Sequence, residues 1–271
     1  MMKRLLLLLS FCASAHAQQG SYALYDYERG EYQVAYNIDQ VRPVASITKL
    51  FTAITVLQSG ADLDEKVRVQ GPSSGHFSKG MMVSRRDLMR AMLVSSDNRA
   101  AETLAITYPG GFAQFMMDED DYMRGHGLIH THMDDATGLS KTNKSTADDL
   151  IRFLSMIATN PEIRTMADDR TAEIIVPKGR KSIHILLHNT NPSIFKFDNI
   201  LISKTGFTNP AGRCVLMLVE KDHRYYGIIV LGQKNVKARS DIANGLITTA
   251  PLPVKPIQLE RGDPIVFDMP L

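Results

Sequence analysis

The repeat of hydrophobic residues changes twice along this chain, and the changes limit the folds it can adopt. Residues 21–37 alternate between apolar and polar positions around a Glu-Arg-Gly-Glu turn, which predicts a β-hairpin. Apolar residues then recur at the helical spacing. They predict a buried helix over 44–57 that ends near Gly60, a helix that begins at Ser84 with Asp87 in its first turn, and helices over 98–107, 111–124 and 146–158.

After residue 170 the apolar stretches become β-branched and are bounded by turn residues. They predict strands joined by hairpins at 172–177, 182–189, 200–206, 214–222 and 225–233, followed by a closing helix over 238–250. Strands at both ends of a helical middle region predict one α+β domain. We expect a mainly antiparallel sheet in which the N-terminal hairpin joins the C-terminal strands.

The first helix contains a lysine among apolar residues. A buried ammonium is costly unless it is paired or loses its proton, and Lys49 has few polar neighbours in sequence. Ser46 stands one turn earlier on the same face, at a helix start, where unpaired N–H groups and the helix dipole favour negative charge. The pair indicates a serine activated by a neutral lysine. The same two residues also fit a capping serine and a lysine that extends to solvent.

A second motif, Ser96-Asp97-Asn98, lies between two predicted helices. Its hydroxyl could relay a proton, and its amide could hold a substrate carbonyl or the lysine. Serine, aspartate and asparagine are also ordinary helix N-caps, so the motif alone does not decide between the two interpretations.

A third motif, Lys204-Thr205-Gly206, ends a predicted strand. Strand alternation directs Lys204 and Gly206 to one face and Thr205 to the other, unless the strand twists there. A lysine and a hydroxyl at a strand edge suit an anionic substrate group, and the glycine lets a substrate backbone come close. The alternative is an exposed strand end. A second S-x-x-K, Ser193 to Lys196, has a strand-like context with no helix, and we do not expect it to take part.

The order of the three motifs is more informative than any one of them. A serine and lysine at a helix start, an S-x-N in a helical middle region and a K-T-G on a late strand resemble the set found in serine β-lactamases and penicillin-binding proteins. The fold that this resemblance implies is α+β, serine β-lactamase/transpeptidase-like. It has a mainly antiparallel sheet flanked by helices and an all-helical middle region.

Two longer segments narrow the resemblance. "DDATGLSKTNKSTADDL" resembles a segment of low-molecular-mass penicillin-binding proteins, the D-alanyl-D-alanine peptidases, and "SKTGFTNPAGRC" is similar to the D-alanyl-D-alanine endopeptidase branch. The chain also ends soon after its predicted closing helix, without the C-terminal β-domain and amphipathic anchor of the typical carboxypeptidase branch. This suits a soluble periplasmic endopeptidase.

The resemblance implies a role for each residue of the first two motifs. Ser46 would attack the D-alanyl carbonyl carbon and become an acyl-ester, with Lys49 as the general base. Ser96 would pass a proton to the leaving amine, and Asn98 would position the substrate and Lys49. Water would then release the acyl group, and neither a metal nor a cofactor is needed.

The resemblance also implies how the substrate is held. Lys204 and Thr205 would bind the carboxylate next to the scissile bond, and Gly206 would let the substrate backbone come close. The backbone N–H groups of Ser46 and Phe207 would form the oxyanion hole. The expected partners are peptidoglycan stem peptides, cut at D-alanyl–diaminopimelate cross-links, and β-lactam antibiotics. A D-alanyl-D-alanine carboxypeptidase is the alternative.

Three other functions remain open at this point. A class A β-lactamase would need an E-x-x-L-N segment to hydrolyse its acyl-enzyme, and the corresponding residues here read "DDATGLSKTN". A metallohydrolase could use His130, His132 and Asp134, whose spacing resembles a zinc site, with His184 and His188 further on. A non-catalytic wall-binding protein could keep the fold without the reaction.

The ends of the chain and its charge bear on where the protein works. Residues 1–17 have a basic start, an apolar run and an A-x-A site, which predict a cleaved secretory signal. Of 31 basic and 29 acidic residues the signal removes Lys3 and Arg4, leaving 29 of each. A neutral chain gives no support to nucleic-acid binding, and no later segment predicts a membrane anchor. We expect a secreted, periplasmic product with a peptidase domain at 18–250 and a tail of unknown role at 251–271.

Overall fold

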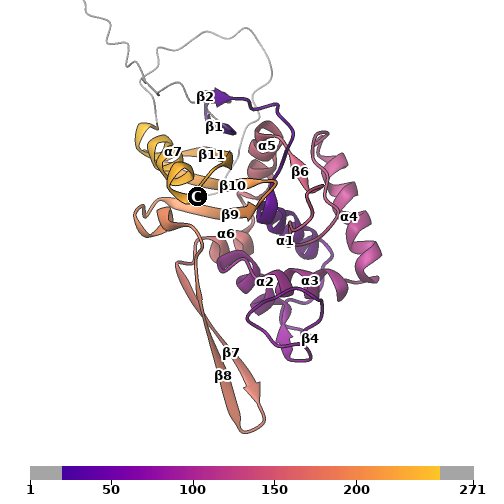
Figure 1. The fold of residues 1–271 in the computed structure, drawn as a ribbon. Coiled ribbons are helices and arrows are strands. Elements are labelled where there is room, and N and C mark those ends of the chain that lie inside the picture. The colour runs from indigo at the N-terminus through magenta and orange to yellow at the C-terminus, as the bar shows by residue number, and fades with distance from the viewer. Residues whose placement is uncertain (1–19, 251–271) are drawn as a thin grey trace, which may run out of the picture.

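The computed structural model describes residues 20–250, so the predicted signal at 1–17 and the tail at 251–271 lie outside the described residues. The main sheet has five antiparallel strands in the order β2-β1-β11-β10-β9. The strands are β1 (Ser21–Asp26), β2 (Glu31–Tyr36), β9 (Ile200–Thr208), β10 (Gly212–Lys221) and β11 (Arg224–Gln233). The pairing of β1 with β11 confirms that the N-terminal hairpin joins the C-terminal strands (Figure 1).

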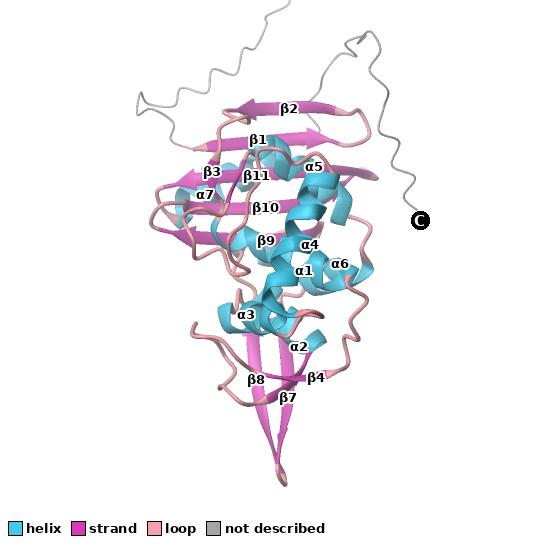
Figure 2. Cartoon of the chain, turned by 90° about the vertical axis from the view of Figure 1, so that its right-hand side faces the viewer, coloured by secondary structure: helices cyan, strands magenta, loops and turns pink. Residues whose placement is uncertain are grey.

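Helices cover both faces of this sheet (Figure 2). The closing helix α7 (Val236–Thr249) packs on one face, where Val215 and Met217 of β10 share a core with Leu246. Leu216 and Leu218 point to the other face and belong to the larger core formed with the remaining helices. Because both faces are buried, β10 and β11 are nearly continuous apolar runs rather than alternating ones.

The helical region surrounds one buried helix, α1. Its members are α1 (Thr48–Gln58), α2 (Arg85–Val94), α3 (Asn98–Ile106), α4 (Gly111–Gly125), α5 (Ala147–Ile157) and α6 (Pro161–Ala167). Every residue of α1 from Thr48 to Val56 is buried, and Phe51 stacks on Phe153 of α5 with ring centroids 3.7 Å apart. This position explains why α1 lacks a polar stripe. Within residues 20–250, no helix has the length and apolar character needed to cross a membrane.

Side-chain caps set where several helices begin. The Ser84 hydroxyl accepts a hydrogen bond from the Asp87 N–H, as the sequence predicts. Asp97 caps α3 through the Ala100 N–H, and Thr146 caps α5. The cap on α3 fixes the chain direction directly after Ser96, which places the S-x-N motif at a helix start.

Two helical segments were not predicted. The helix α6 follows Asn160-Pro161, a capping residue and an N1 proline that together form a helix-start signal. The expectation of no helix at Ser193 was wrong, because Pro192–Phe195 form a 3-10 turn (η2) capped by Asn191. The Ser193 hydroxyl donates to Asn244 on α7. This second S-x-x-K therefore serves the contact between η2 and α7.

The predicted strands at 172–177 and 182–189 do not join the main sheet. They form a separate two-stranded hairpin of β7 (Thr171–Lys178) and β8 (Lys181–His188), which extends away from the body (Figure 2). Two more small ribbons pair β3 (Arg42–Pro43) with β6 (Lys144–Ser145) and β4 (Lys66–Arg68) with β5 (Met82–Ser84).

Removing the ring that supports α1 should destabilise the fold. We expect Phe153→Ala to lower the free energy of unfolding by about 3–5 kcal/mol, because the change deletes a fully buried ring and leaves a cavity. Urea denaturation followed by circular dichroism measures the effect. Phe195→Ala removes a half-exposed ring and is the matched control, with an expected change within about 1 kcal/mol. Equal losses in the two variants would contradict the central role of α1.

Candidate active site

Ser46 lies in a short 3-10 turn, η1 (Ala45–Ile47), directly before α1. Ala45 has a φ of 49°, a left-handed conformation that is strained for a residue with a side chain. Two glycines hold the turn from either side. A Cβ on Gly138 would meet the Ala45 carbonyl oxygen at 2.0 Å, and a Cβ on Gly206 would meet the Val44 oxygen at 2.8 Å. The backbone around Ser46 is therefore held by close contacts that only glycine permits.

Lys49 is fully buried below Ser46 and contacts three different parts of the chain. Its Nζ lies 3.1 Å from Ser46 Oγ and donates to Asn98 Oδ1 at 2.7 Å and to the Thr137 carbonyl oxygen at 2.6 Å. Burial lowers the pKa of Lys49 to about 7, although the carboxylates of Asp135 and other acidic residues partly oppose this shift. Near neutral pH the amine is therefore partly unprotonated and within reach of the Ser46 proton.

Lys204 is also buried. The alternative interpretation of the Lys204-Thr205-Gly206 motif, an exposed strand end, was therefore wrong. Its Nζ donates to Ser96 Oγ at 2.9 Å and to the Thr205 carbonyl oxygen at 3.0 Å. Ser96 has a left-handed φ of 61°. Burial lowers the pKa of Lys204 well below its ordinary value, and the nearby charge of Lys49 acts in the same direction. This contact ties strand β9 to the loop between α2 and α3.

The other residues of strand β9 divide between its two sides. The close approach of Gly206 to the Ser46 backbone puts it on the same side as Lys204. The Thr205 hydroxyl instead contacts the hydroxyl of Thr190 at 2.5 Å. The ring of Phe207 is half-exposed, and the guanidinium of its cross-strand neighbour Arg213 lies 3.5 Å from the ring centroid. Arg213 is a cation beside this strand that sequence reasoning did not identify.

The loop after α4 supplies a contact that the motifs did not predict. Asp135 accepts hydrogen bonds from the N–H groups of Thr137, Gly138 and Ser140 and from the Thr137 hydroxyl, at 2.6–2.7 Å. These bonds fix the loop so that the Thr137 carbonyl faces Lys49. The segment "DDATGLS" was noted only as a resemblance, and a tight Asx turn at Asp135 is the signal that could have identified its role.

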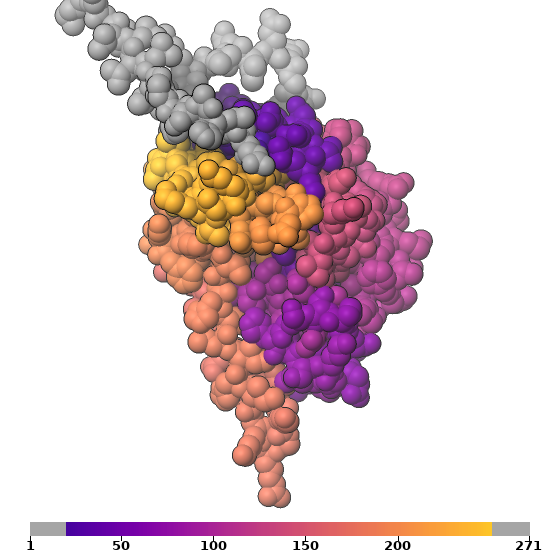
Figure 3. All heavy atoms as spheres, viewed as in Figure 1, coloured from indigo at the N-terminus to yellow at the C-terminus, as the bar shows by residue number. Residues whose placement is uncertain are grey.

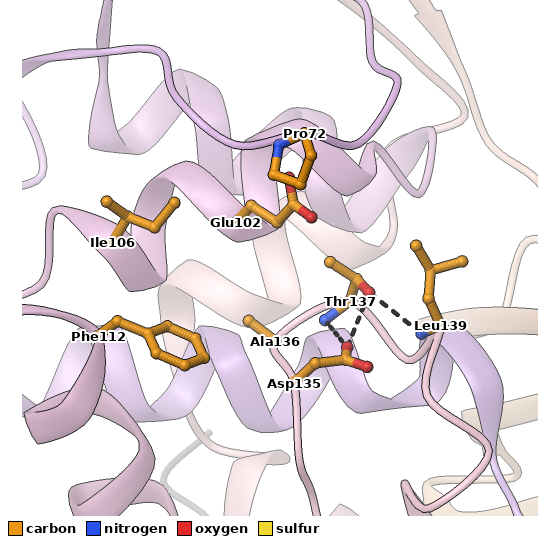
Figure 4. Close-up of a pocket in the computed structure, with 8 residues that line it drawn as sticks. All are labelled: Pro72, Glu102, Ile106, Phe112, Asp135, Ala136, Thr137 and Leu139. Carbon is orange, nitrogen blue, oxygen red and sulfur yellow. Dashed lines mark hydrogen bonds between the residues drawn. The ribbon is translucent and has the colours of Figure 1, made fainter.

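Residues of this loop, from Asp135 to Leu139, line part of a cavity of about 320 Å³ (Figure 4). Its lining includes Glu102 and Asp135, but not Ser46, Lys49 or Lys204. Both oxygens of Glu102 accept hydrogen bonds from Ser73, and Asp135 is held by its own loop. The hydrogen bonds that hold each of them suit a structural role more than that of a general base.

The histidines of the alternative zinc site do not come together. His132 contacts Asp134 at 2.7 Å, whereas His184 lies on the β7–β8 hairpin and contacts Glu173 at 2.8 Å. His130 is exposed, and its ring nitrogen is 3.9 Å from Asp149. Within residues 20–250, no three histidine, cysteine or acidic side chains are grouped as a metal site requires.

Known proteins resemble this chain along most of its length. A family model described as D-alanyl-D-alanine carboxypeptidase matches residues 11–235. A D-alanyl-D-alanine endopeptidase of Escherichia coli is 34% identical over 220 residues, covering 78% of this chain and 70% of the relative. A D-alanyl-D-alanine endopeptidase of Pseudomonas aeruginosa is also 34% identical, over 89% of this chain and 83% of its own length.

Solved structures agree with the fold. A DD-transpeptidase of Streptomyces superimposes with a TM-score of 0.80 at 24% identity, covering 85% of this chain and 95% of that one. A penicillin-binding protein of Listeria monocytogenes, solved in its ampicillin-bound form, gives a TM-score of 0.75 at 28% identity over 85% of this chain and 96% of its own. These matches confirm the predicted fold class and the resemblance to penicillin-binding proteins. The chain belongs to the D-alanyl-D-alanine carboxypeptidase family of serine D,D-peptidases.

Proposed function

We propose that the protein is a D-alanyl-D-alanine endopeptidase that cuts cross-linked peptidoglycan through an acyl-enzyme on Ser46. The observation that carries the proposal is the convergence of three separate parts of the chain. Lys49 contacts Ser46 and Asn98, and Lys204 contacts Ser96 in the same motif as Asn98. The relatives at 34% identity are named endopeptidases, while carboxypeptidases of Salmonella typhimurium and Escherichia coli are 29% identical. This difference favours the endopeptidase over the carboxypeptidase.

The first step forms the acyl-enzyme. Neutral Lys49 takes the proton of the Ser46 hydroxyl while the oxygen attacks the D-alanyl carbonyl carbon. Collapse of the tetrahedral intermediate breaks the C–N bond, and Ser96 passes a proton to the leaving amine. Asn98 accepts a hydrogen bond from Lys49 and so keeps the Lys49 amine directed at Ser46. Attack by water on the ester then releases the acyl group and restores the serine.

The second group of residues binds the substrate. Lys204 and Thr205 bind the carboxylate next to the scissile bond. The guanidinium of Arg213, over the Phe207 ring, adds a positive charge beside them. The N–H groups of Ser46 and Phe207 form the oxyanion hole. Gly206 leaves room for the substrate backbone. A family of cell-wall peptidases and the predicted signal at 1–17 together support a secreted, periplasmic enzyme whose partners are peptidoglycan stem peptides and β-lactams.

Benzylpenicillin should form a one-to-one covalent adduct with the protein. We expect the adduct on the wild type and on Ser193→Ala, and none on Ser46→Ala. Ser46 has the Lys49 amine 3.1 Å from its hydroxyl, whereas the Ser193 hydroxyl donates to Asn244. Intact-mass measurement after exposure to the antibiotic tests this. The Ser193→Ala variant is the matched control for the second S-x-x-K.

Other outcomes of the same measurement would contradict the proposal. Hydrolysed antibiotic without a lasting adduct would indicate a β-lactamase. Intact antibiotic and no adduct would indicate a binding protein. Incubation with cross-linked muropeptides then separates the two peptidase activities, because an endopeptidase yields monomers while a carboxypeptidase releases only terminal D-alanine.

The rate of acylation should depend on the protonation of Lys49. Its pKa of about 7 means that the amine is protonated at lower pH and cannot accept the serine proton. We expect the second-order rate of acylation by benzylpenicillin to rise about tenfold per pH unit below pH 7 and to level off above it. Lys49→Arg, which stays protonated, should remove this rise along with the activity. A rate that is constant from pH 5.5 to 8.5 would argue against Lys49 as the base.

Adding one methyl group at Gly206 should displace the nucleophile. A Cβ there would lie 3.0 Å from the Ser46 nitrogen and 2.8 Å from the Val44 oxygen. We expect Gly206→Ala to slow acylation by about 100-fold, since a shift of the reacting group by about 1 Å has effects of that size. Gly245→Ala in α7 has nothing within 4 Å of its Cβ and is the control. It should leave acylation unchanged and raise the free energy of unfolding by about 0.5–1 kcal/mol.

A further inference from the structure

The hairpin β7–β8 is the part of the described chain that projects furthest from the body (Figure 3). Its inner face carries buried side chains, among them Ile174, Val176 and Leu187, and packs on α2. The residues between them along each strand point to the outer face and are exposed, as at Ile175 and Leu186. The hairpin is therefore anchored by one side only, and its far end is open to solvent.

The far end of the hairpin is strongly basic. Gly179 makes the turn with a φ of 62°, and the three residues around it, Lys178, Arg180 and Lys181, are all exposed cations. No ion pair joins any of the three to a residue within 20–250, and they stand within four consecutive positions of the chain. Like charges this close repel each other, so the fold gains nothing from the cluster. An anionic partner would gain from it.

The base of the hairpin lies beside the active site. Thr190, two residues after β8, contacts the Thr205 hydroxyl on β9. Each strand has eight residues, which at about 3.3 Å per residue puts the basic tip about 25 Å from that contact. A short soluble peptide bound at Ser46 cannot reach the tip. A polymer that extends well beyond the scissile bond can touch both places.

We propose that the hairpin tip is a docking surface for carboxylates of the insoluble wall polymer, on the part of the polymer that lies next to the cross-link being cut. This inference rests on the proposed function, because peptidoglycan stem peptides carry several free carboxylates and repeat along the polymer. Lys178, Arg180 and Lys181 bind these carboxylates through exposed charge, so the contact raises local substrate concentration without touching the reacting atoms. The interaction weakens as salt is added, because solvent-exposed charges are screened.

The test compares a tip variant, Lys178→Glu/Arg180→Glu/Lys181→Glu, with a control variant of the same net charge. The control reverses Lys196, Lys221 and Lys237, which lie near the main sheet and α7 rather than on the hairpin. Sedimentation with purified peptidoglycan sacculi is measured in the Ser46→Ala background, so that binding is separated from cleavage. We expect the tip variant to bind about tenfold more weakly at low salt and the control to bind like the parent protein.

Activity gives the second readout. With Ser46 intact, the tip variant should be acylated by benzylpenicillin and cleave a soluble cross-linked muropeptide at wild-type rates, which also verifies folding. It should release fragments from intact sacculi several-fold more slowly, in line with its lower binding.

Several results would overturn the inference. Equal binding of tip variant and parent to sacculi would do so, as would an equal loss in the control variant, which would indicate attraction by net charge alone. If the tip variant lost binding to anionic phospholipid vesicles and not to sacculi, the partner would be a membrane. Failure of the wild type to cleave soluble muropeptides would instead count against the proposed function, and the binding comparison would still decide the docking surface.

Discussion

The structure depends on one buried amine. Lys49 lies at zero exposure in a helix that is surrounded by other helices, and water cannot satisfy its Nζ there. Ser46, Asn98 and Thr137 do so instead, and they come from the turn before α1, the start of α3 and the loop after α4. A buried charge without such contacts would cost several kcal/mol. The positions of these three elements are thus set by a group whose chemistry the enzyme uses.

The same arrangement joins the helical region to the sheet. Strand β9 reaches the helical side through Lys204, whose amine contacts Ser96, and through Gly206, whose backbone packs against the turn that carries Ser46. The hydroxyl of Ser46 therefore lies where the two regions meet, and neither region forms the site alone. This explains why the three motifs are distant in sequence and why substitutions at small residues such as Gly206 affect the chemistry.

Much of this could be predicted from the sequence because periodicity and caps are local properties. The change from helical to strand spacing predicted the α+β class, in which the N-terminal hairpin pairs with the C-terminal strands, and Ser84 with Asp87 predicted the cap on α2. The predictions failed where tertiary contacts decide. The strands β7 and β8 look like sheet strands but pair only with each other, and the burial of Lys204 depends on helices distant in sequence. Lys49 contacts the backbone carbonyl of Thr137, which every residue type has, so the identities of the residues could not predict this contact.

The strained backbone at Ala45 and at Ser96 has a consequence for how the protein loses activity. Ala45 and Ser96 both hold left-handed backbone angles that an isolated chain would abandon. Packing from β9 and from the Gly138 loop keeps them there, so any loosening of that packing lets both residues relax while the helices and the sheet stay folded. Activity then reports on the local order of the site rather than on the unfolding of the whole domain. A sample can therefore keep its full secondary structure and melting temperature after the geometry that makes Ser46 reactive has relaxed.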